Sequence, residues 1–343
     1  MTHKATFFGL QLWGEDGMAH LRDSEKLKAA GVEVTFNPDT LDRNHLPAKA
    51  DFDIAGVFMA SKVDEMTIAA LPNLRLITTL STGYDHIDLK AAAAKGIVVS
   101  SVPAYGANTV AEYAFALILA LSRKVCETRD RVHFDGKFST EGLVGFDLAG
   151  KTIGIVGTGS IGRHAVRIAK GFGMNVIATD ANPDSAFAAE MGFAYVALED
   201  LLAKSDIVSI HCPYLPATYH LINQKNIGMM KRGAYLINTS RGPIVETEAL
   251  VGALKSGPIA GAGLDVLEEE GETKDELAIL ASGHPNAEAL QAILLNHALI
   301  RMPNVIVTPH NAFNSREALL RILDATIDNI VGFVNGTPVN VVK

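Results

Sequence analysis

The chain has 343 residues, a formal net charge of −8, 48% hydrophobic residues and only two cysteines. This length exceeds what one hydrophobic core usually supports, so we expect two domains. The negative charge and the lack of a long Lys or Arg run argue against a nucleic-acid partner, and the longest apolar run, residues 113–121, is too short to cross a membrane. The N-terminus lacks a signal-peptide pattern and the cysteines lack disulfide or metal-ligand spacing, so we expect a cytoplasmic protein with no bound metal.

Strand-like and helix-like segments alternate through the first hundred residues. Such alternation predicts parallel βαβ units, here a small doubly wound domain. No GxGxxG pattern occurs in this region, so we expect no second cofactor site there. The expected strands are 5–10, 32–36, 53–59, 74–80 and 97–101, and the expected helices lie near 18–30, 67–71 and 88–94.

A long helical pattern follows over residues 108–131. Asn108 is a suitable cap, and Glu112 supports the first turn. Apolar residues cover most of the circumference before charged residues take over, which predicts a helix buried nearly all round. Such a helix could link two domains and pack against a partner subunit.

The segment 151–180 reads strand, glycine-rich turn, helix, strand. In GTGSIG, Gly157 permits a tight turn, Gly159 lets backbone N–H groups approach a pyrophosphate, and Gly162 lets the helix pack on the strand. Asp180 ends the second strand, where a carboxylate accepts ribose hydroxyls and repels the 2′-phosphate of NADP. The segment therefore predicts an NAD site. A tight packing turn without a ligand is the alternative.

The alternation resumes beyond Asp180 and predicts the second half of a Rossmann-type sheet. We expect a helix over 224–232, strands over 206–213, 234–240, 259–266 and 304–310, a charged and then helical stretch over 267–301, and a last helix over 315–334. Ligand contacts should lie at the carboxyl ends of the strands. The expected cofactor-binding residues are Gly157, Gly159, Ser160, Ile161, Gly162, Asp180, His211, Cys212, Pro213, Thr239, Ser240 and Asp265.

Three polar residues lie at strand ends or just beyond them: Arg241, Glu270 and His310. An arginine binds a carboxylate through two parallel hydrogen bonds, and a histidine exchanges a proton near neutral pH. A carboxylate beside that histidine orients it and favours its charged form. Taken one by one, these residues could equally be a surface arginine, a solvated glutamate and a capping histidine.

The motifs as a set resemble the family of D-isomer-specific 2-hydroxyacid dehydrogenases, nearly end to end. The shared motifs are GTGSIG with Asp180, HCP at 211–213, NTSRGPIVE at 238–246, GLDV at 263–266 followed by Glu270, TPH at 308–310, STGYDHIDL at 81–89 and SVPAYGANTVAEYA at 101–114. Within the family, the sequences around Tyr105 and Phe313 look most like the D-lactate dehydrogenase branch. Formate dehydrogenases carry glutamine where Glu270 stands, so formate oxidation is disfavoured.

The resemblance implies two doubly wound α/β domains with an active cleft between them: a Rossmann cofactor domain, 104–310, and a smaller flavodoxin-like substrate domain, 1–103 with 311–343. It also implies NAD as the cofactor and a homodimer built on the helix near 108–131. Arg241, Glu270 and His310 become the catalytic residues. Thr82, Gly83, Tyr105 and Phe313 become the substrate-binding residues.

The expected reaction interconverts a small, pyruvate-like 2-oxo acid and its D-2-hydroxy acid by hydride transfer. His310 is the expected general acid and base, Glu270 supports it, and Arg241 holds the substrate. One alternative is a catalytically idle NAD(H)-sensing protein of the corepressor type. Another is a structural Rossmann module in which the three polar residues coincide by chance.

Overall fold

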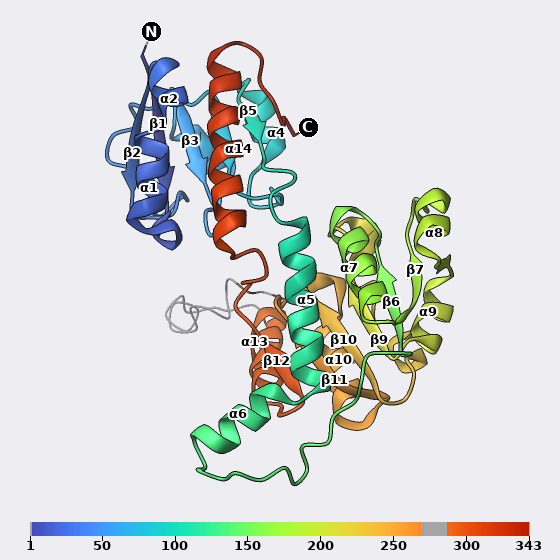
Figure 1. Ribbon diagram of the computed structural model, residues 1–343. Coiled ribbons are helices and arrows are strands. Elements are labelled where there is room, and N and C mark those ends of the chain that lie inside the picture. Colours follow the sequence, from blue (N-terminus) through green and yellow to red (C-terminus); the bar gives the residue numbers. More distant parts are fainter. Residues whose placement is uncertain (1, 269, 271–286, 343) are drawn as a thin grey trace. The chain divides into compact units, whose positions relative to one another are not determined.

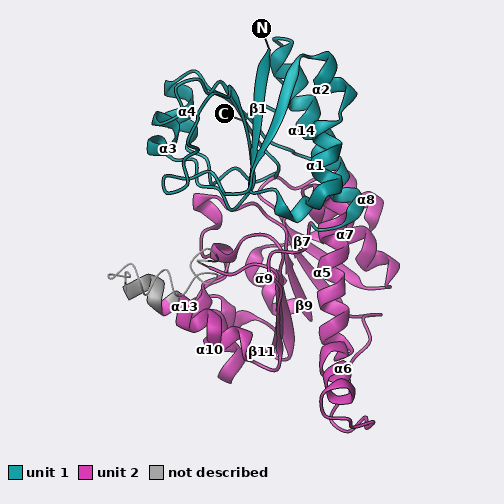
Figure 2. Ribbon diagram, turned by 90° about the vertical axis from the view of Figure 1, so that its left-hand side faces the viewer, with its two compact units in different colours: residues 1–105, 314–343 teal, residues 106–313 magenta. Residues whose placement is uncertain are grey.

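The computed structural model describes residues 2–268, 270 and 287–342. The chain divides into two compact units, unit 1 with residues 1–105 and 314–343 and unit 2 with residues 106–313 (Figure 2). These boundaries lie two or three residues beyond those expected at 103 and 310. Residues 311–313 fall in unit 2 because the Asp265 carboxylate binds the N–H groups of Asn311 and Ala312.

Unit 1 contains a parallel sheet with the strand order β2-β1-β3-β4-β5 among its described residues. This is the flavodoxin-like order, as expected for the smaller domain. Its strands are β1 (His3–Phe8), β2 (Val32–Asn37), β3 (Ile54–Val57), β4 (Leu76–Thr79) and β5 (Val98–Ser100). The short central strands β3 and β4 are buried on both faces, which is typical of a sheet covered by helices on each side.

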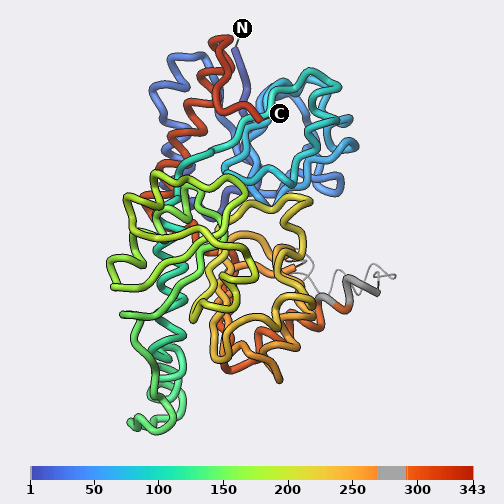
Figure 3. Tube along the Cα trace, turned by 90° about the vertical axis from the view of Figure 1, so that its right-hand side faces the viewer, coloured from blue at the N-terminus to red at the C-terminus, as the bar shows by residue number. Residues whose placement is uncertain are grey.

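Helices cover both faces of the unit 1 sheet (Figure 2). One face carries α1 (Gly14–Arg22), α2 (Glu25–Ala29) and α14 (Arg316–Val334), and the other carries α3 (Glu65–Ala69) and α4 (Leu89–Ala94). The C-terminal helix α14 packs against the N-terminal α1 and α2, so both ends of the chain belong to this unit (Figure 3).

The helix expected over 18–30 is wrong as a single element, because it is divided into α1 and α2. Ser24 separates the two, and its hydroxyl oxygen accepts the N–H of Leu27 as the N-cap of α2. A side chain that satisfies the first N–H groups of a helix favours a new start at that position.

Unit 2 contains a second parallel sheet, with the order β12-β11-β10-β9-β6-β7-β8 among its described residues (Figure 1). Counted from β6, this is the Rossmann order extended by one strand. Its strands are β6 (Thr152–Val156), β7 (Asn175–Thr179), β8 (Ala194–Tyr195), β9 (Ile207–Ile210), β10 (Ala234–Asn238), β11 (Ile259–Leu264) and β12 (Val305–Val307). Both sheets confirm the predicted fold class.

The helices of unit 2 form a layer on each face of its sheet (Figure 2). On one face are α5 (Ala107–Ser122) and α7 (Ser160–Gly171), whose buried side chains form one core with β6 and β7. On the other are α9 (Leu198–Lys204), α10 (Thr247–Ser256) and α13 (Ala287–Ile300), while α8 (Ser185–Met191) lies beside α7 and β8.

The helix expected over 224–232 is wrong, because only the 3-10 turn Ile227–Met229 forms there. The side chains of Asn223 and Asn226 bind nearby backbone instead: Asn226 accepts the N–H of Asn223 and donates to the Leu221 carbonyl oxygen. Such local bonds compete with the helical ladder. Within the stretch expected over 267–301, residues 269 and 271–286 lie outside the described residues, which resume with α13.

The helix expected over 108–131 is also wrong as a continuous element, because it ends at Ser122 and restarts as α6 (Val125–His133). Between them, Lys124 adopts a left-handed backbone with φ of 51°. The Ser122 carbonyl oxygen accepts the N–H of Phe146, which closes the end of α5. The N-cap of α5 is Gly106, and Asn108 donates to Glu112 instead. α5 has many buried residues and α6 has none, so the predicted burial holds only for α5.

No helix among the described residues is long and apolar enough to cross a membrane.

Candidate active site

The glycine-rich turn between β6 and α7 has the shape expected of a dinucleotide loop. Gly157 has φ of 92°, and a Cβ there would lie 2.6 Å from the backbone nitrogen of Cys212. A Cβ on Gly162 would strike the Gly157 carbonyl oxygen. By contrast, a Cβ on Gly159 would meet no atom within 4 Å. Packing within the chain thus requires the outer two glycines, whereas Gly159 faces open space at the start of α7, where a pyrophosphate would lie.

Asp180 follows β7 and is held by the same turn. Its Oδ2 accepts the N–H and hydroxyl of Thr158 at 2.6 and 3.0 Å, and its Oδ1 accepts the N–H of Asn182 at 2.8 Å. Partial burial alone would raise the pKa of Asp180, but the hydrogen bonds from Asn182 and Thr158 outweigh it and lower the pKa. The side chain is therefore a carboxylate at neutral pH, with lone pairs left for ribose hydroxyls.

Arg163 on α7 is the cationic side chain that could neutralise a 2′-phosphate near Asp180, but it is bound to other side chains. Its guanidinium forms an ion pair with Asp184 and lies 4.5 Å from the centre of the Phe187 ring. Ser160 and Ile161, also predicted to bind the cofactor, form the first turn of α7. No described side chain caps this helix, since its N-cap is Gly159, so its first N–H groups remain available to a ligand.

His211 and Cys212 follow β9, and both are buried. Burial lowers the pKa of His211 to about 4 and raises the pKa of the Cys212 thiol to about 11, so both are neutral near pH 7. His211 Nε2 lies 2.9 Å from the Ser209 hydroxyl, while its Nδ1 and the Thr239 hydroxyl are buried without a hydrogen-bond partner among the described residues. Unpaired buried polar atoms at the carboxyl ends of β9 and β10 fit a bound ligand.

Ser240 and Arg241 follow β10. The Ser240 hydroxyl donates to the Cys212 carbonyl oxygen at 2.5 Å, and this bond joins the loops after β9 and β10. Pro213, another expected cofactor-binding residue, directly follows Cys212. The half-buried Arg241 guanidinium donates to the Ser240 carbonyl oxygen at 2.9 Å. The Asn238 side chain donates to the Arg241 carbonyl oxygen and accepts the N–H of Ser240, so it fixes the backbone around the arginine.

His310 and Glu270 are in contact, although 40 positions separate them in the chain. His310 Nδ1 lies 3.0 Å from Glu270 Oε2, and Glu270 Oε1 accepts the N–H of Leu267 at 3.3 Å. Because an ionised carboxylate only accepts, the bond places a hydrogen on Nδ1 and leaves Nε2 to exchange a proton with a substrate. His310 has a left-handed backbone with φ of 52°, a conformation that its loop must impose.

Asp265, at the end of β11, is the residue that holds this loop. Its carboxylate is buried and accepts the Thr308 hydroxyl and the N–H groups of Asn311 and Ala312, and its carbonyl oxygen accepts the N–H of His310. Burial raises the pKa of Asp265, although these bonds oppose the shift. The sequence predicts Asp265 only as a cofactor ligand. Because 43 positions separate Asp265 from Thr308, no local pattern signals its contacts with the His310 loop.

The expected substrate-binding residues Thr82 and Gly83 lie in unit 1, in the loop after β4. Among the described residues, their N–H groups have no hydrogen-bond acceptor, while the Thr82 hydroxyl donates to the Val102 carbonyl oxygen and the Gly83 carbonyl oxygen accepts from Ser81. Tyr105 is the last residue before the chain enters unit 2, and Phe313, which is buried, is the last before it returns.

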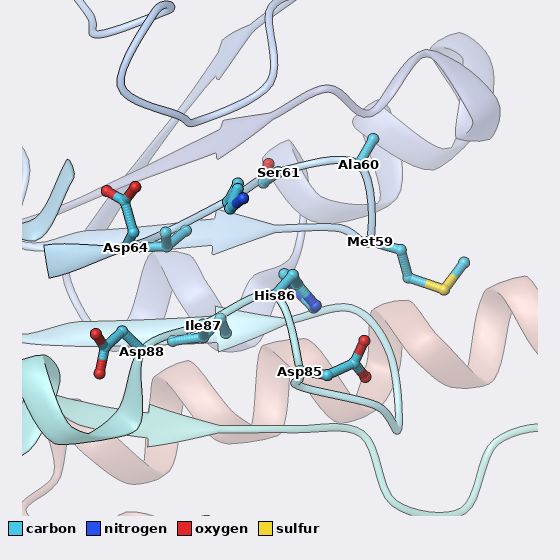
Figure 4. A pocket seen from close by; sticks show the side chains of 10 residues that line it. Met59, Ala60, Ser61, Asp64, Asp85, His86, Ile87 and Asp88 are labelled. Atoms are coloured by element: carbon cyan, nitrogen blue, oxygen red, sulfur yellow. The ribbon is translucent and has the colours of Figure 1, made fainter. Parts of the chain in front are cut away.

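A cavity of about 400 Å³ lies within unit 1, beside the same loop. It is lined by two segments, Met59–Asp64 after β3 and Asp85–Asp88 after β4 (Figure 4). Arg241, Glu270 and His310 are not among its lining residues. Among the described part of the chain, no cluster of His, Cys, Asp or Glu side chains could hold a metal ion.

Comparison with known proteins matches residues 115–312 to the NAD-binding domain of D-isomer-specific 2-hydroxyacid dehydrogenases. The chain belongs to this family. NAD is accordingly the cofactor of this family member, and the open space at Gly159 and the Asp180 carboxylate fit it.

Relatives of this D-2-hydroxyacid dehydrogenase cover nearly the whole chain. The 2-hydroxyacid dehydrogenase A of Aspergillus oryzae is 39% identical over 304 residues, which is 88% of this chain and 84% of that protein. The solved pyruvate reductase of Chlamydomonas reinhardtii has a TM-score of 0.86 at 37% identity and covers 98% of both chains. The D-lactate dehydrogenase of Aquifex aeolicus, solved with NAD and lactic acid, has a TM-score of 0.82 at 33% identity and covers 98% of this chain and 96% of that one.

Proposed function

We propose that the protein interconverts a small, pyruvate-like 2-oxo acid and the corresponding D-2-hydroxy acid, with NAD as the hydride carrier. The contact between His310 and Glu270 supports this proposal, because a histidine oriented by a carboxylate can exchange a proton. His310 follows β12, and the dinucleotide loop follows β6, so both lie after strands of the same parallel sheet. The likeness to a pyruvate reductase and to a D-lactate dehydrogenase supports the choice of substrate class.

Each polar residue has one task in the proposed reaction. When bound, NADH supplies the hydride that C2 of the 2-oxo acid receives. His310 donates a proton from Nε2 to the carbonyl oxygen, so that the C=O double bond becomes a C–O single bond with one new C–H and one new O–H bond, and Glu270 keeps the imidazole oriented. Arg241 binds the substrate's carboxylate and carbonyl oxygen, and the unpaired N–H groups of Thr82 and Gly83 bind the carboxylate.

The deciding experiment follows NADH oxidation with pyruvate, glyoxylate, phenylpyruvate and hydroxypyruvate side by side, with the chirality of each product determined. We expect turnover of at least one acid to the D product. No turnover of any of them, with NADH still bound, would favour the NAD(H)-sensing alternative.

Substituting Arg241→Lys tests the substrate clamp. Lysine keeps the charge but loses the planar pair of donors, so kcat/KM should fall by an amount equivalent to about 2–4 kcal/mol, the scale of losing one positioned catalytic donor. The Kd for NADH, measured by fluorescence, should barely change. A near-normal kcat/KM in this variant would show that Arg241 does not bind the substrate.

We also propose a homodimer built on α5 and α6. α6 has no buried residue, and the segment after it exposes Phe134, Phe138 and Val144, with 97% of Phe138 accessible. Apolar side chains gathered on one exposed segment are typical of a protein interface. Light scattering should give twice the mass of the chain, and Phe138→Ser should shift the protein toward the monomer. A monomeric wild-type protein contradicts this proposal.

A further inference from the structure

A second histidine–carboxylate pair lies beside the first one. His220 Nε2 donates to Glu268 Oε1 at 2.7 Å, and the two side chains are only 27% and 16% exposed. Glu268 lies two positions before Glu270, which contacts His310. The two pairs thus share one short stretch of chain after β11.

Glu268 binds two helices in addition to His220. Its Oε2 accepts the N–H and the hydroxyl of Thr247, the first residue of α10, at 2.8 and 2.5 Å. Its carbonyl oxygen accepts the side-chain amide of Asn296, on α13, at 2.7 Å. The carboxylate is therefore satisfied on both oxygens, which a half-buried charge requires.

His220 is bound to the loop that carries Arg241. Its backbone N–H donates to the Pro243 carbonyl oxygen at 2.8 Å, and its ring stacks on Tyr219 with 3.9 Å between centroids. Its φ of 47° is left-handed, a conformation that non-glycine residues adopt only when their surroundings impose it. The backbone of His220 is therefore bound by Pro243, and its ring is packed on Tyr219 as it meets Glu268.

The loop after Arg241 also touches the Glu268 segment directly. A Cβ on Gly242 would strike the carbonyl group of Leu267 and the nitrogen of Glu268. The N–H of Leu267 in turn donates to Glu270. A chain of contacts thus runs from the Arg241 loop through His220 and Glu268 to the residue that orients His310.

We propose that His220 and Glu268 are positioning residues that hold Glu270 in reach of His310 and keep the Arg241 loop beside it. This inference rests on the proposed dehydrogenase function. Neither residue touches the reacting atoms; each acts through Glu270 and Arg241. A displacement of about 1 Å at a catalytic group is enough to lower a rate by about 100-fold, so a small loosening of this stretch has a measurable effect.

The first test compares three variants in steady-state kinetics of 2-oxo acid reduction. In His220→Ala, kcat should fall by about 10- to 100-fold, because Glu270 loses its support, while the KM for NADH should stay within about 2-fold. In His220→Gln, whose amide can donate to Glu268, most of kcat should return. His45→Ala is the matched control, since His45 forms the same kind of pair with Asp42 at 2.9 Å in an exposed loop of unit 1.

Wild-type kcat in His220→Ala, or a His220→Gln variant as impaired as His220→Ala, would overturn the inference. A rise in NADH KM as large as the fall in kcat would also overturn it, because that result indicates a general loss of structure.

A crystal structure of His220→Ala provides a readout that does not depend on activity. The contact between Glu270 Oε2 and His310 Nδ1 should persist in wild-type crystals and be lost in the variant. If the contact persists in the variant, the positioning role is refuted, whatever the enzyme does. If wild-type enzyme reduces no 2-oxo acid, the proposed function fails, and the crystal structures still decide the positioning role.

Discussion

His211 is buried at the end of β9, and burial lowers its pKa to about 4. An unfolded histidine binds a proton below about pH 6.5, whereas the folded one stays neutral until about pH 4. The unfolded state therefore binds more protons within this window, and the free energy of unfolding should fall as the pH is lowered through it, by up to about 3 kcal/mol.

Urea unfolding at several pH values checks this prediction. In His211→Gln, the extra loss of stability between pH 6.5 and 4 should disappear. His45 serves as the control of opposite sign: the Asp42 carboxylate raises its pKa, so His45→Gln should not relieve the loss on acidification. Parallel pH dependences for wild type and His211→Gln would contradict the assignment.

We expect Asp180 to decide the choice between NADH and NADPH. Its carboxylate is ionised and held by Thr158 and Asn182, and Arg163 is engaged by Asp184 and Phe187. A 2′-phosphate would meet like charge and lose the ribose hydrogen bonds, so NADH should be preferred by about 100-fold or more in kcat/KM. Asp180→Ala should narrow the preference for NADH, because NADH should bind more weakly and NADPH should bind more tightly than in wild type. Kinetics with both cofactors test this, and equal use of NADPH by wild type would refute it.

The loop from Thr308 to Ala312 is the element that presents His310, and it depends on one buried carboxylate. Asp265 accepts three hydrogen bonds from this loop. In Asp265→Asn, the amide nitrogen would face a loop donor, so one bond should become unfavourable and cost about 1–3 kcal/mol of unfolding free energy. Because His310 would be less well placed, kcat should fall more than NADH binding does. Unfolding measurements on Asp265→Asn check the loss of stability, and kinetic measurements check the fall in kcat. An unchanged kcat would show that the loop keeps its conformation without the Asp265 bonds.

Much of this element-level organisation was predictable from short-range patterns. Apolar β-branched runs located the strands, and the spacing of Gly157, Gly159 and Gly162 located the cofactor loop, because both depend on nearby residues. The break at Lys124 was not predictable, because it depends on bonds to Gly142 and Phe146, which lie far along the chain. The helix expected near Asn226 failed for a local reason, because apolar periodicity does not show that the Asn223 and Asn226 side chains bind the backbone.

Contacts between distant residues were the least predictable part of the site. The pairing of Glu270 with His310 followed from family resemblance, since nothing in their spacing joins them. The contacts of Asp265 and of Glu268 with His220 had no signal in the sequence, because acidic residues near a strand end are usually solvated and only the folded chain shows what they bind.

At the scale of the whole molecule, unit 2 is continuous in sequence and unit 1 is not. Every residue expected to bind the dinucleotide lies in unit 2. The two hydrophobic cores of unit 2 consist of residues from 106–313 alone. A fragment of residues 106–313 should therefore unfold cooperatively and bind NADH. Circular dichroism and NADH fluorescence test this prediction.

The matched fragment of residues 1–105 should stay unfolded when made alone. It lacks α14, which supplies the buried side chains Ile322, Leu323, Ile327 and Ile330 to unit 1. Removing so much apolar surface from a small domain leaves too little to offset the entropy of ordering the chain. A folded 1–105 fragment, or a disordered 106–313 fragment, would contradict this division of the stabilising contacts.

The late arrival of α14 has a consequence during translation. A ribosome must add the 208 residues of 106–313 between the end of the first segment of unit 1 and the start of the second. At typical rates of synthesis this takes about 10 to 40 seconds, during which the five strands of unit 1 lack the helix that covers one face of their sheet. The nascent N-terminal segment is thus the part of this protein most exposed to chaperones and proteases, while the cofactor-binding unit can already fold outside the exit tunnel.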